Sequence, residues 1–277
     1  MTSGELPSFD LVVASVDRTD QLSRLLTSLQ SQTHRSFRVL VVDQNEDDRL
    51  DDVLSGHDTL HIERLRSARG LSRARNVALP RLESDVVAFP DGDCLYPPDL
   101  LENVGRRFLA DPRLDGVTGR AVSEAGSFSS SWAMNPARLT RANLWNRAIS
   151  FTIFLRLPLV RRTGAFDEQL GLGSGTASSS GEETEYLVRA LEAGARIDYD
   201  PTLTVTHDEK PFADSIGARE GASIGYILRK HDYPLRTVTR MFVRPAGGAA
   251  IALARGDARG MRFQVDTLRG RWRGYRS

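Results

Sequence analysis

The residues with the clearest capacity for chemistry are two aspartates one residue apart, Asp91 and Asp93, with Gly92 between them. They follow a short apolar run, Val86 to Phe89, whose polar flanks are typical of a buried strand in an α/β sheet. Carboxylates at the C-terminal tip of such a strand lie in the crevice where open α/β sheets bind ligands. Two hard oxygen donors suit Mg²⁺ or Mn²⁺, and such a cation suits a diphosphate. Turns also select Asp and Gly, so a plain turn is the alternative.

Two further polar clusters stand beside predicted elements. Asp43 and Gln44 end a second apolar run and begin an acidic turn. Another cluster opens a predicted helix, where acidic side chains complement the helix dipole and so fit a structural role as well as a catalytic one. This helix-opening cluster consists of Glu182, Glu183 and Glu185.

Arginines surround a predicted helix start at residues 70–76, GLSRARN. Guanidinium groups and free backbone N–H groups at a helix N-terminus form an anion site, which makes Arg69 and Arg73 candidate phosphate ligands. For Arg75 we expect a solvent-exposed position on the helix face. His207 ends a strand-like run, where a lone histidine is more often structural than a ligand.

The elements that must position these residues alternate between strands and helices. Leucines at positions 22, 25, 26 and 29 have the spacing of an amphipathic helix. The alternation predicts an α/β fold with a mostly parallel sheet and right-handed crossovers. Strands are expected at 9–15, 37–43, 59–65, 86–89, 115–122, 150–155, 196–200 and 203–207, and helices at 19–30, 70–82, from Pro97, and at 181–194.

Residues 123–150 have no clean period and contain Trp132 and Trp145, and such long irregular loops are usually functional. A glycine- and serine-rich loop at 171–181 is a candidate lid. From residue 211 onward we expect two or three basic helices.

Composition restricts the class of protein. The chain has 277 residues, 40% hydrophobic and 26% charged, which is ordinary for a globular protein. The single cysteine, Cys94, excludes an intramolecular disulfide, and the N-terminus has no signal-peptide pattern. We therefore expect a cytoplasmic protein. Residues 211–277 carry 13 Lys and Arg against 5 Asp and Glu, whereas the rest carries 24 against 31, without the basic stripe that nucleic acid demands.

Eight sequence segments, taken in their order along the chain, resemble glycosyltransferase family 2, whose members have the GT-A fold. The resemblance covers roughly residues 9 to 208, about three quarters of the chain. The resembling segments are VVASVDR (12–18), LTSLQSQT (26–33), VLVVDQN (39–45), GLSRARN (70–76), DVVAFPDGDC (85–94), GAFDEQL (164–170), SGEETEYLVRALEAGARIDY (180–199) and THD (206–208).

The resemblance implies a role for each matching residue. Asp43 and Gln44 stand where the family usually has two aspartates, one of which contacts the base, and the glutamine leaves the base undecided. The implied nucleotide- and donor-binding residues are Ala14, Val16, Asp17, Asp43, Gln44, Arg69, Arg73, Asp91 and Gly92. The implied metal ligands are Asp91, Asp93 and His207.

Glu183 falls where the family places its catalytic base, usually an aspartate. The remaining residues expected on the acceptor side are Trp132, Glu182 and Glu185. A base that activates an acceptor hydroxyl, and a cation that neutralises the departing diphosphate, together give an in-line displacement with inversion. The resemblance therefore implies Mn²⁺ or Mg²⁺, a UDP-, GDP- or dTDP-linked sugar donor, and a saccharide or lipid-linked acceptor in polysaccharide or glycoconjugate biosynthesis.

Two alternatives stay open at this point. One is a phosphatase or phosphotransferase with Asp91 as nucleophile, although Leu95 differs from the Thr or Val that such enzymes tend to carry. The other is a non-catalytic module that binds a nucleotide-sugar.

We expect a catalytic domain at residues 1–210, with a nucleotide-binding half at about 9–122 and an acceptor half at about 123–210, followed by a basic helical extension at 211–277. Arginines beside aromatics in the extension suit peripheral contact with the anionic inner face of a membrane, if the acceptor is lipid-linked. The alternative is that its helices pack on the catalytic domain. Pro245, Gly247 and Gly248 are expected to interrupt any long helix there.

Overall fold

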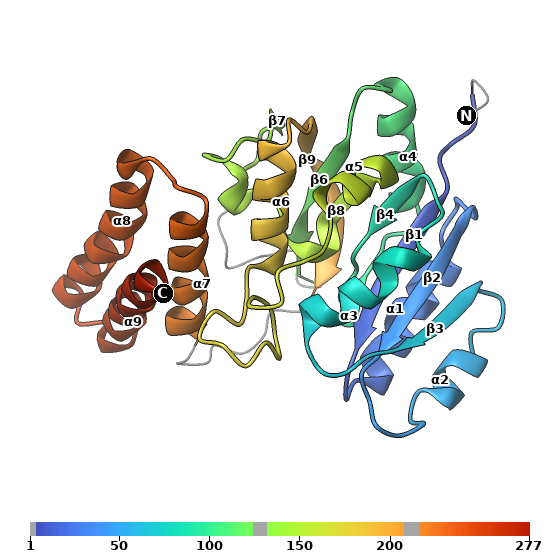
Figure 1. The fold of residues 1–277 in the computed structure, drawn as a ribbon, viewed down its shortest axis with the longest axis horizontal. Coiled ribbons are helices and arrows are strands. Elements are labelled where there is room, and N and C mark those ends of the chain that lie inside the picture. The colour runs from blue at the N-terminus through green and yellow to red at the C-terminus, as the bar shows by residue number, and fades with distance from the viewer. Residues whose placement is uncertain (1–3, 124–131, 208–215) are drawn as a thin grey trace. The chain divides into compact units, whose positions relative to one another are not determined.

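The structure is a computed structural model that describes residues 4–123, 132–207 and 216–277 (Figure 1). Its strands are β1 (Phe9–Ser15), β2 (Phe37–Asp43), β3 (Ile62–Arg66), β4 (Val86–Ala88), β5 (Cys94–Leu95), β6 (Gly116–Val122), β7 (Ala137–Arg138), β8 (Ile153–Arg156) and β9 (Ile197–His207). Its α-helices are α1 (Thr19–Gln30), α2 (Asp51–Ser55), α3 (Leu71–Ala78), α4 (Leu100–Ala110), α5 (Leu157–Thr163), α6 (Glu182–Glu192), α7 (Ile216–Lys230), α8 (Leu235–Ala254) and α9 (Ala258–Arg276). Short 3₁₀ turns cover Leu79–Arg81, Leu144–Asn146 and Ser150–Thr152.

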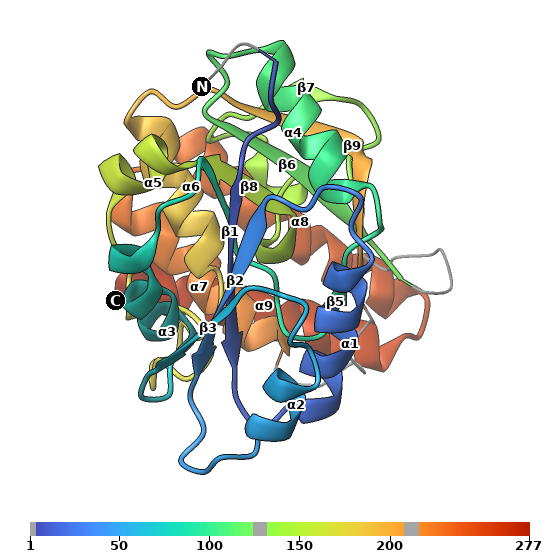
Figure 2. The ribbon, with the colours of Figure 1, turned by 90° about the vertical axis from the view of Figure 1, so that its right-hand side faces the viewer.

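The described strands form one sheet in the order β3-β2-β1-β4-β8-β6-β9-β5, with β7 paired to β9. The first four strands of this order are parallel, whereas β8 is antiparallel to both of its neighbours. β6 and β9 are parallel again, and the short β5 and β7 run antiparallel to β9. Parallel strands need crossover connections, and Figure 2 shows α1 on one face of β1–β3 and α3 on the other. The prediction of an α/β sheet flanked by helices is confirmed.

The core behind the sheet follows from the helix periodicity. The four leucines of α1, at positions 22, 25, 26 and 29, are all fully buried. They belong to one apolar cluster with residues of β1, β2 and α4. Burying one such leucine contributes about 1.5–3 kcal/mol of stability. This packing holds the C-terminal ends of β1 and β2 in place.

Two expectations in the second half of the sheet are wrong. Residues 150–152 form a 3₁₀ turn, and β8 begins only at Ile153. The two pieces expected at 196–200 and 203–207 are one strand, β9. Pro201 lies where the register against β6 shifts, so the missing N–H of this proline removes no ladder hydrogen bond. The helix expected from Pro97 begins three residues later, at Leu100.

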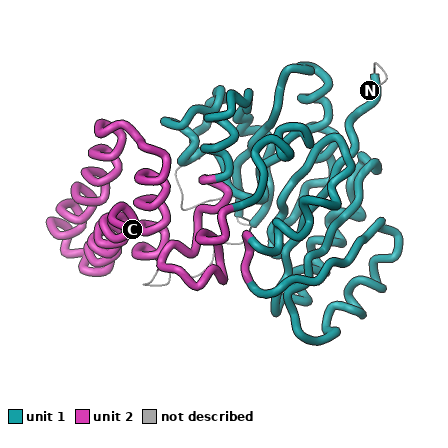
Figure 3. The backbone as a smooth tube through the Cα atoms, in the orientation of Figure 1, with its two compact units in different colours: residues 1–69, 73–166, 186–209 teal, residues 70–72, 167–185, 210–277 magenta. Residues whose placement is uncertain are grey.

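Contacts divide the chain into two compact units (Figure 3). The first contains residues 1–69, 73–166 and 186–209 and holds the sheet. The second contains residues 70–72, 167–185 and 210–277 and holds α7, α8 and α9. Among the described residues, none of the helices combines the length and the apolar character needed to cross a bilayer.

Glycines bring α7 and α9 into close contact. On α7, Gly217, Gly221 and Gly225 are four residues apart, and a Cβ at Gly217 would lie 2.9 Å from the backbone oxygen of Phe263 on α9. The expected break in α8 is wrong, because this helix runs unbroken through Pro245. Pro245 is buried inside this helix, a position where a proline costs roughly 3 kcal/mol.

Candidate functional site

The strand order brings the polar strand ends together. Because β1 lies between β2 and β4, their C-terminal ends share one edge of the sheet. The backbone N–H of Gln44 donates to the Ser15 oxygen at 2.9 Å, and Ala14 forms a parallel bridge with Asp91. Gly92 is buried, and a Cβ there would lie 3.9 Å from the Ala14 oxygen. The structure thus places the Asp43 and Asp91 segments on either side of the β1 tip, as the α/β topology predicts.

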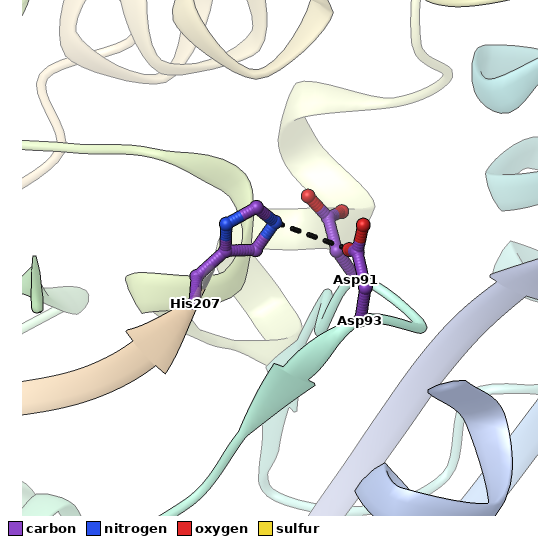
Figure 4. A group of neighbouring side chains, drawn as sticks. All are labelled: Asp91, Asp93 and His207. Atoms are coloured by element: carbon purple, nitrogen blue, oxygen red, sulfur yellow. Dashed lines mark hydrogen bonds and ion pairs between the residues drawn. The ribbon is translucent and has the colours of Figure 1, made fainter. Parts of the chain in front are cut away.

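A second strand pairing adds His207 to the aspartates (Figure 4). β5 follows Asp93 directly and pairs antiparallel with the end of β9, so that Cys94 lies opposite His207. The Nε2 atom of His207 lies 3.1 Å from Oδ1 of Asp93. One potential ligand atom from each of Asp91, Asp93 and His207 lies within 4.8 Å of the others. A residue 114 positions away in the chain therefore completes the cluster.

The 3₁₀ turn before β8 contacts two members of this cluster. The hydroxyl of Ser150 donates to Oδ1 of Asp91 at 3.0 Å. The ring of Phe151 stacks on His207, with centroids 4.7 Å apart and planes 4° from parallel. These contacts fix the orientation of the imidazole and of one carboxylate. The replacement of the expected strand by a turn at 150–152 is what makes them possible.

Arg75 corrects one sequence prediction. Its side chain is only 2% exposed, so the expected position on a solvated helix face is wrong. Its Nη2 lies 3.3 Å from Oδ1 of Asp91, and its guanidinium carbon lies 5.7 Å and 5.4 Å from the ring centroids of Phe89 and Phe166. The two rings contact each other edge to face, with centroids 5.1 Å apart, and the guanidinium lies against both of them. Such contacts favour a fixed guanidinium position and leave its charge in place.

Arg18 is a further residue that the sequence analysis did not single out. It forms an ion pair with Asp93 through Nη1 and Oδ2. The only sequence signal was its place directly after Asp17, at the end of the resembling segment VVASVDR. Together with Arg75, it places one guanidinium against each aspartate of the pair.

The donor set fits a hard divalent cation. Two carboxylates and one imidazole are ligands that Mn²⁺ accepts, and carboxylate oxygens also suit Mg²⁺. Cys94, directly after Asp93, is not among the side chains whose ligand atoms come together here. Burial, followed by the charges of Asp91 and Asp93, raises the pKa of its thiol well above the ordinary value. The described residues thus offer oxygen and nitrogen donors at this place.

The Asp43 carboxylate is enclosed by the protein's own donors. It is fully buried; Oδ2 accepts from Nε of Arg64 at 2.9 Å, and Oδ1 accepts from the N–H of Asn45 at 2.9 Å. Burial raises the pKa of Asp43, but the hydrogen bonds from Asn45 and Arg64 outweigh it and hold the pKa below the ordinary value. Gln44 beside it is also buried, at 6% exposure.

Asp17 sits just after the β1 tip in a left-handed conformation, with φ of 55°. Its backbone N–H donates to the side-chain oxygen of Asn45 at 2.8 Å. Its carboxylate pairs with Arg69 at 2.7 Å and with Arg49 at 2.8 Å. Two predicted donor-binding residues, Asp17 and Arg69, are therefore brought into contact.

The other predicted site residues are less closely grouped. Ala14, Val16 and Trp132 are half-buried, and Arg73 is exposed on α3. Asp208 of the THD segment, and residues 124–131 of the irregular loop, lie outside the described residues.

The three glutamates open α6 and belong to the second unit. Glu182 is buried and Glu183 is half-buried. Glu185 is fully buried and accepts from Nζ of Lys230 at 2.6 Å and lies 3.3 Å from Nε2 of His231. Its carboxylate is thus engaged with α7 and the residue that follows it.

Fold and site together define an α/β protein with two aspartates and a histidine gathered at the carboxyl edge of its sheet. The model of glycosyl transferase family 2 matches residues 10–166, more than half of the chain. The chain belongs to glycosyltransferase family 2, as the resemblance implied.

Two relatives are also named glycosyltransferases. The chain is 29% identical over 213 residues to a pre-mycofactocin glycosyltransferase of Mycobacterium tuberculosis, across 72% of this chain and 42% of that protein. It therefore spans less than half the length of that relative. It is 23% identical over 225 residues to the glycosyltransferase AglE of Haloferax volcanii, across 77% of this chain and 71% of that protein.

Solved structures share the fold. The mannosyltransferase PcManGT of Pyrobaculum calidifontis, in complex with GDP-Man and Mn²⁺, aligns with a TM-score of 0.66 at 16% identity, over 98% of this chain and 88% of that one. TarS of S. aureus, residues 1–349 in complex with UDP-GlcNAc, aligns with a TM-score of 0.62 at 16% identity, over 95% and 91%. The predicted GT-A fold is confirmed.

Proposed function

We propose that this chain is a metal-dependent, inverting glycosyltransferase that moves a sugar from a nucleotide-sugar to an acceptor hydroxyl. The observation that carries the proposal is the convergence of Asp91, Asp93 and His207 at the carboxyl edge of the sheet, with ligand atoms within 4.8 Å of one another. The family membership and the nucleotide-sugars bound by PcManGT and TarS support this use of the edge.

Asp91, Asp93 and His207 would hold Mn²⁺ or Mg²⁺, which when bound supplies charge neutralisation to a leaving diphosphate. The chain's own residues supply the rest of the site. Arg75 and Ser150 orient the Asp91 carboxylate through its Oδ1 atom, while Phe151 fixes the plane of His207. The tip of β1 and the Asp43–Gln44 pair form the proposed nucleotide side. Arg69 and Arg73 are proposed to meet the diphosphate or the sugar.

Glu183 is the proposed general base. It would take the proton of the acceptor hydroxyl as the oxygen attacks the anomeric carbon, while the bond from that carbon to the diphosphate oxygen breaks. One carboxylate on the side opposite the leaving group gives inversion. Glu182 is the competing candidate. Glu185 is disfavoured, because its carboxylate is engaged with Lys230 and His231.

The partners and the setting are also proposals. The donor would be UDP-, GDP- or dTDP-linked, and the acceptor a saccharide or lipid-linked glycan in polysaccharide or glycoconjugate biosynthesis. Trp132 is proposed on the acceptor side. The catalytic domain at residues 1–210, the extension at 211–277 and a cytoplasmic location with contact to the inner face of a membrane are part of the same proposal.

The test is nucleoside diphosphate release from UDP-, GDP- and dTDP-sugars, with Mn²⁺, with Mg²⁺ and with a chelator. A transferase releases nucleoside diphosphate only with the metal, and NMR of the glycoside formed reports the anomeric configuration. Release of inorganic phosphate would instead indicate a phosphatase. Metal-dependent binding of nucleotide without turnover of any donor and acceptor pair would indicate a non-catalytic module.

A further inference from the structure

The exposed side of α8 combines apolar and basic residues without an acidic one. Four large apolar side chains on this helix are between 55% and 77% exposed. Arginines at positions 236, 240 and 244, one helical turn apart, are exposed beside them. We call this surface the α8 face; it consists of Leu235, Arg236, Arg240, Val243, Arg244, Ile251 and Leu253.

Helix geometry sorts the α8 face into two adjoining stripes. At 100° per residue, Leu235, Val243 and Leu253 fall within an arc of about 80°, and the three arginines occupy the next 80°. Ile251 falls within the arc of the arginines, so one apolar side chain stands among the basic ones. Helices with exposed apolar residues beside a basic row lie in the interface of a membrane, where the apolar side chains enter the headgroup region. A face that served only solubility would not expose leucine, valine and isoleucine together.

A buried guanidinium next to this face points to an anionic ligand independently. Arg271 on α9 is 9% exposed, and its Nε and Nη1 atoms are buried with no hydrogen-bond partner among the described residues. Burial, followed by the neighbouring charge of Arg244, lowers the pKa of Arg271 to about 10, so the side chain stays charged at neutral pH. The neighbouring charge of Arg244, together with two Arg271 nitrogens that have no partner in the described part of the chain, favours a phosphate at this place.

We infer that the α8 face docks on an anionic phospholipid bilayer, with Arg244 and Arg271 together taking a lipid phosphate. Charge complementarity selects this occupant: residues 216–277 carry 13 Lys and Arg against 4 Asp and Glu, and α8 itself has no acidic residue. The surface lies outside the part of the chain matched by the family model, so vesicle binding can be tested without any glycosyl transfer.

Point variants are the right probes, because α9 is part of the unit's packing. Gly270 and Gly274 contact the backbone of α7, so removing residues 256–277 would dismantle the helices. The test variant is Arg236→Gln, Arg240→Gln and Arg244→Gln combined. Its matched control replaces three exposed arginines of the first unit, Arg35, Arg106 and Arg113, with glutamine, and so removes the same charge.

The experiment is co-sedimentation of the full chain with phosphatidylcholine vesicles, with and without phosphatidylglycerol. Each arginine near anionic headgroups contributes about a fivefold gain in binding, so the α8 variant is expected to lose on the order of 100-fold while the control variant binds as the wild type does. Binding should also weaken with salt. A second variant, Leu235→Ser with Leu253→Ser, should bind more weakly without any charge change. Arg271→Met should weaken binding to phosphatidylglycerol vesicles while circular dichroism shows that the helices remain.

Several results would overturn the inference. No sedimentation of the wild type with anionic vesicles at low salt is one, and equal losses in the α8 and control variants are another. A soluble oligomer that Leu235→Ser with Leu253→Ser dissociates, without any vesicle binding, would assign the face to a second copy of the chain instead.

Discussion

The guanidinium of Arg75 lies 3.3 Å from the Asp91 carboxylate and against the rings of Phe89 and Phe166. Asp91 follows a short strand, and the hydroxyl of Ser150 donates to the same carboxylate oxygen, Oδ1, at 3.0 Å. With Oδ1 accepting from both Arg75 and Ser150, its second oxygen has a fixed direction. Partners that orient metal-binding carboxylates matter almost as much as the ligands themselves. Arg75 is therefore a positioning residue for the proposed cation.

Replacing Arg75 tests this role. Arg75→Lys keeps the charge but loses the planar guanidinium that contacts both rings and Asp91, and we expect Mn²⁺ affinity to fall about 10- to 100-fold. The measurement is Mn²⁺ titration by calorimetry, with circular dichroism as the check on folding. Arg106→Gln, an exposed arginine on α4, is the control and should titrate as the wild type does. Unchanged Mn²⁺ affinity in a folded Arg75→Lys protein would assign the arginine a purely structural role.

Replacing Asp93 tests the metal assignment directly. Asp93→Ala removes a carboxylate that faces both His207 and Arg18, and we expect Mn²⁺-dependent nucleotide binding to be lost. A thermal-shift screen of UDP, GDP, CDP and dTDP measures it, because a ligand at a hundredfold excess over its Kd stabilises by about 2.7 kcal/mol. Should the variant bind nucleotide with the same affinity and the same metal response, the central assignment is wrong.

Replacing Glu183 separates binding from turnover. Glu183→Gln keeps the size of the side chain but cannot accept a proton, so we expect donor binding to persist and turnover to fall about 10²- to 10⁴-fold. Glu182→Gln is the matched comparison. An inactive Glu182→Gln enzyme beside an active Glu183→Gln enzyme would show that the base is one position earlier in α6.

The strand ends could be predicted from the sequence because their signals are local. An apolar run followed by Asp91 and Asp93, and another that ends in Asp43, each mark a buried strand with a polar tip, and parallel topology brings such tips to one edge. The place of Arg75 could not be predicted in the same way. Its burial depends on Phe166, 91 positions further along, and its spacing on α3 is equally typical of an exposed face. Likewise, His207 joins the cluster only through the pairing of β5 with β9.

The stability of the second unit should depend on pH through Lys230. Burial raises the pKa of Asp167, but hydrogen bonds from Lys230 and the Gln169 N–H outweigh it and hold the pKa below its ordinary 3.8. Burial lowers the pKa of Lys230, but hydrogen bonds to Asp167 and Glu185 raise it above its ordinary 10.5. The lowered pKa of Asp167 adds stability that is lost as the pH falls through that pKa. The raised pKa of Lys230 adds stability that is lost as the pH rises through that pKa.

The stability that Asp167 and Lys230 contribute through their ion pair is therefore fully present between about pH 4 and pH 10. Lys230→Met leaves the buried Glu185 short of a donor, and we expect a loss of about 1–3 kcal/mol at pH 7 and a smaller loss at pH 3. Urea unfolding followed by circular dichroism measures both. Arg229→Met, next along α7 and 64% exposed, is the control and should change little at either pH. An equal loss for Lys230→Met at pH 3 and pH 7 would contradict the ion-pair argument.

Glycines in the helical unit give the last prediction, because two of them in helices have opposite surroundings. A Cβ on Gly225 of α7 would collide with the backbone oxygen of Arg271, whereas a Cβ on Gly247 of α8 would meet nothing within 4 Å. Gly225→Ala must push α9 away, and overpacking of this kind costs about 1–3 kcal/mol. Gly247→Ala should instead stabilise by about 0.5–1 kcal/mol, since alanine loses less backbone entropy in a helix. Thermal unfolding of the two variants should therefore shift in opposite directions. A shift in the same direction for both would mean that α7 and α9 are not in the close contact described.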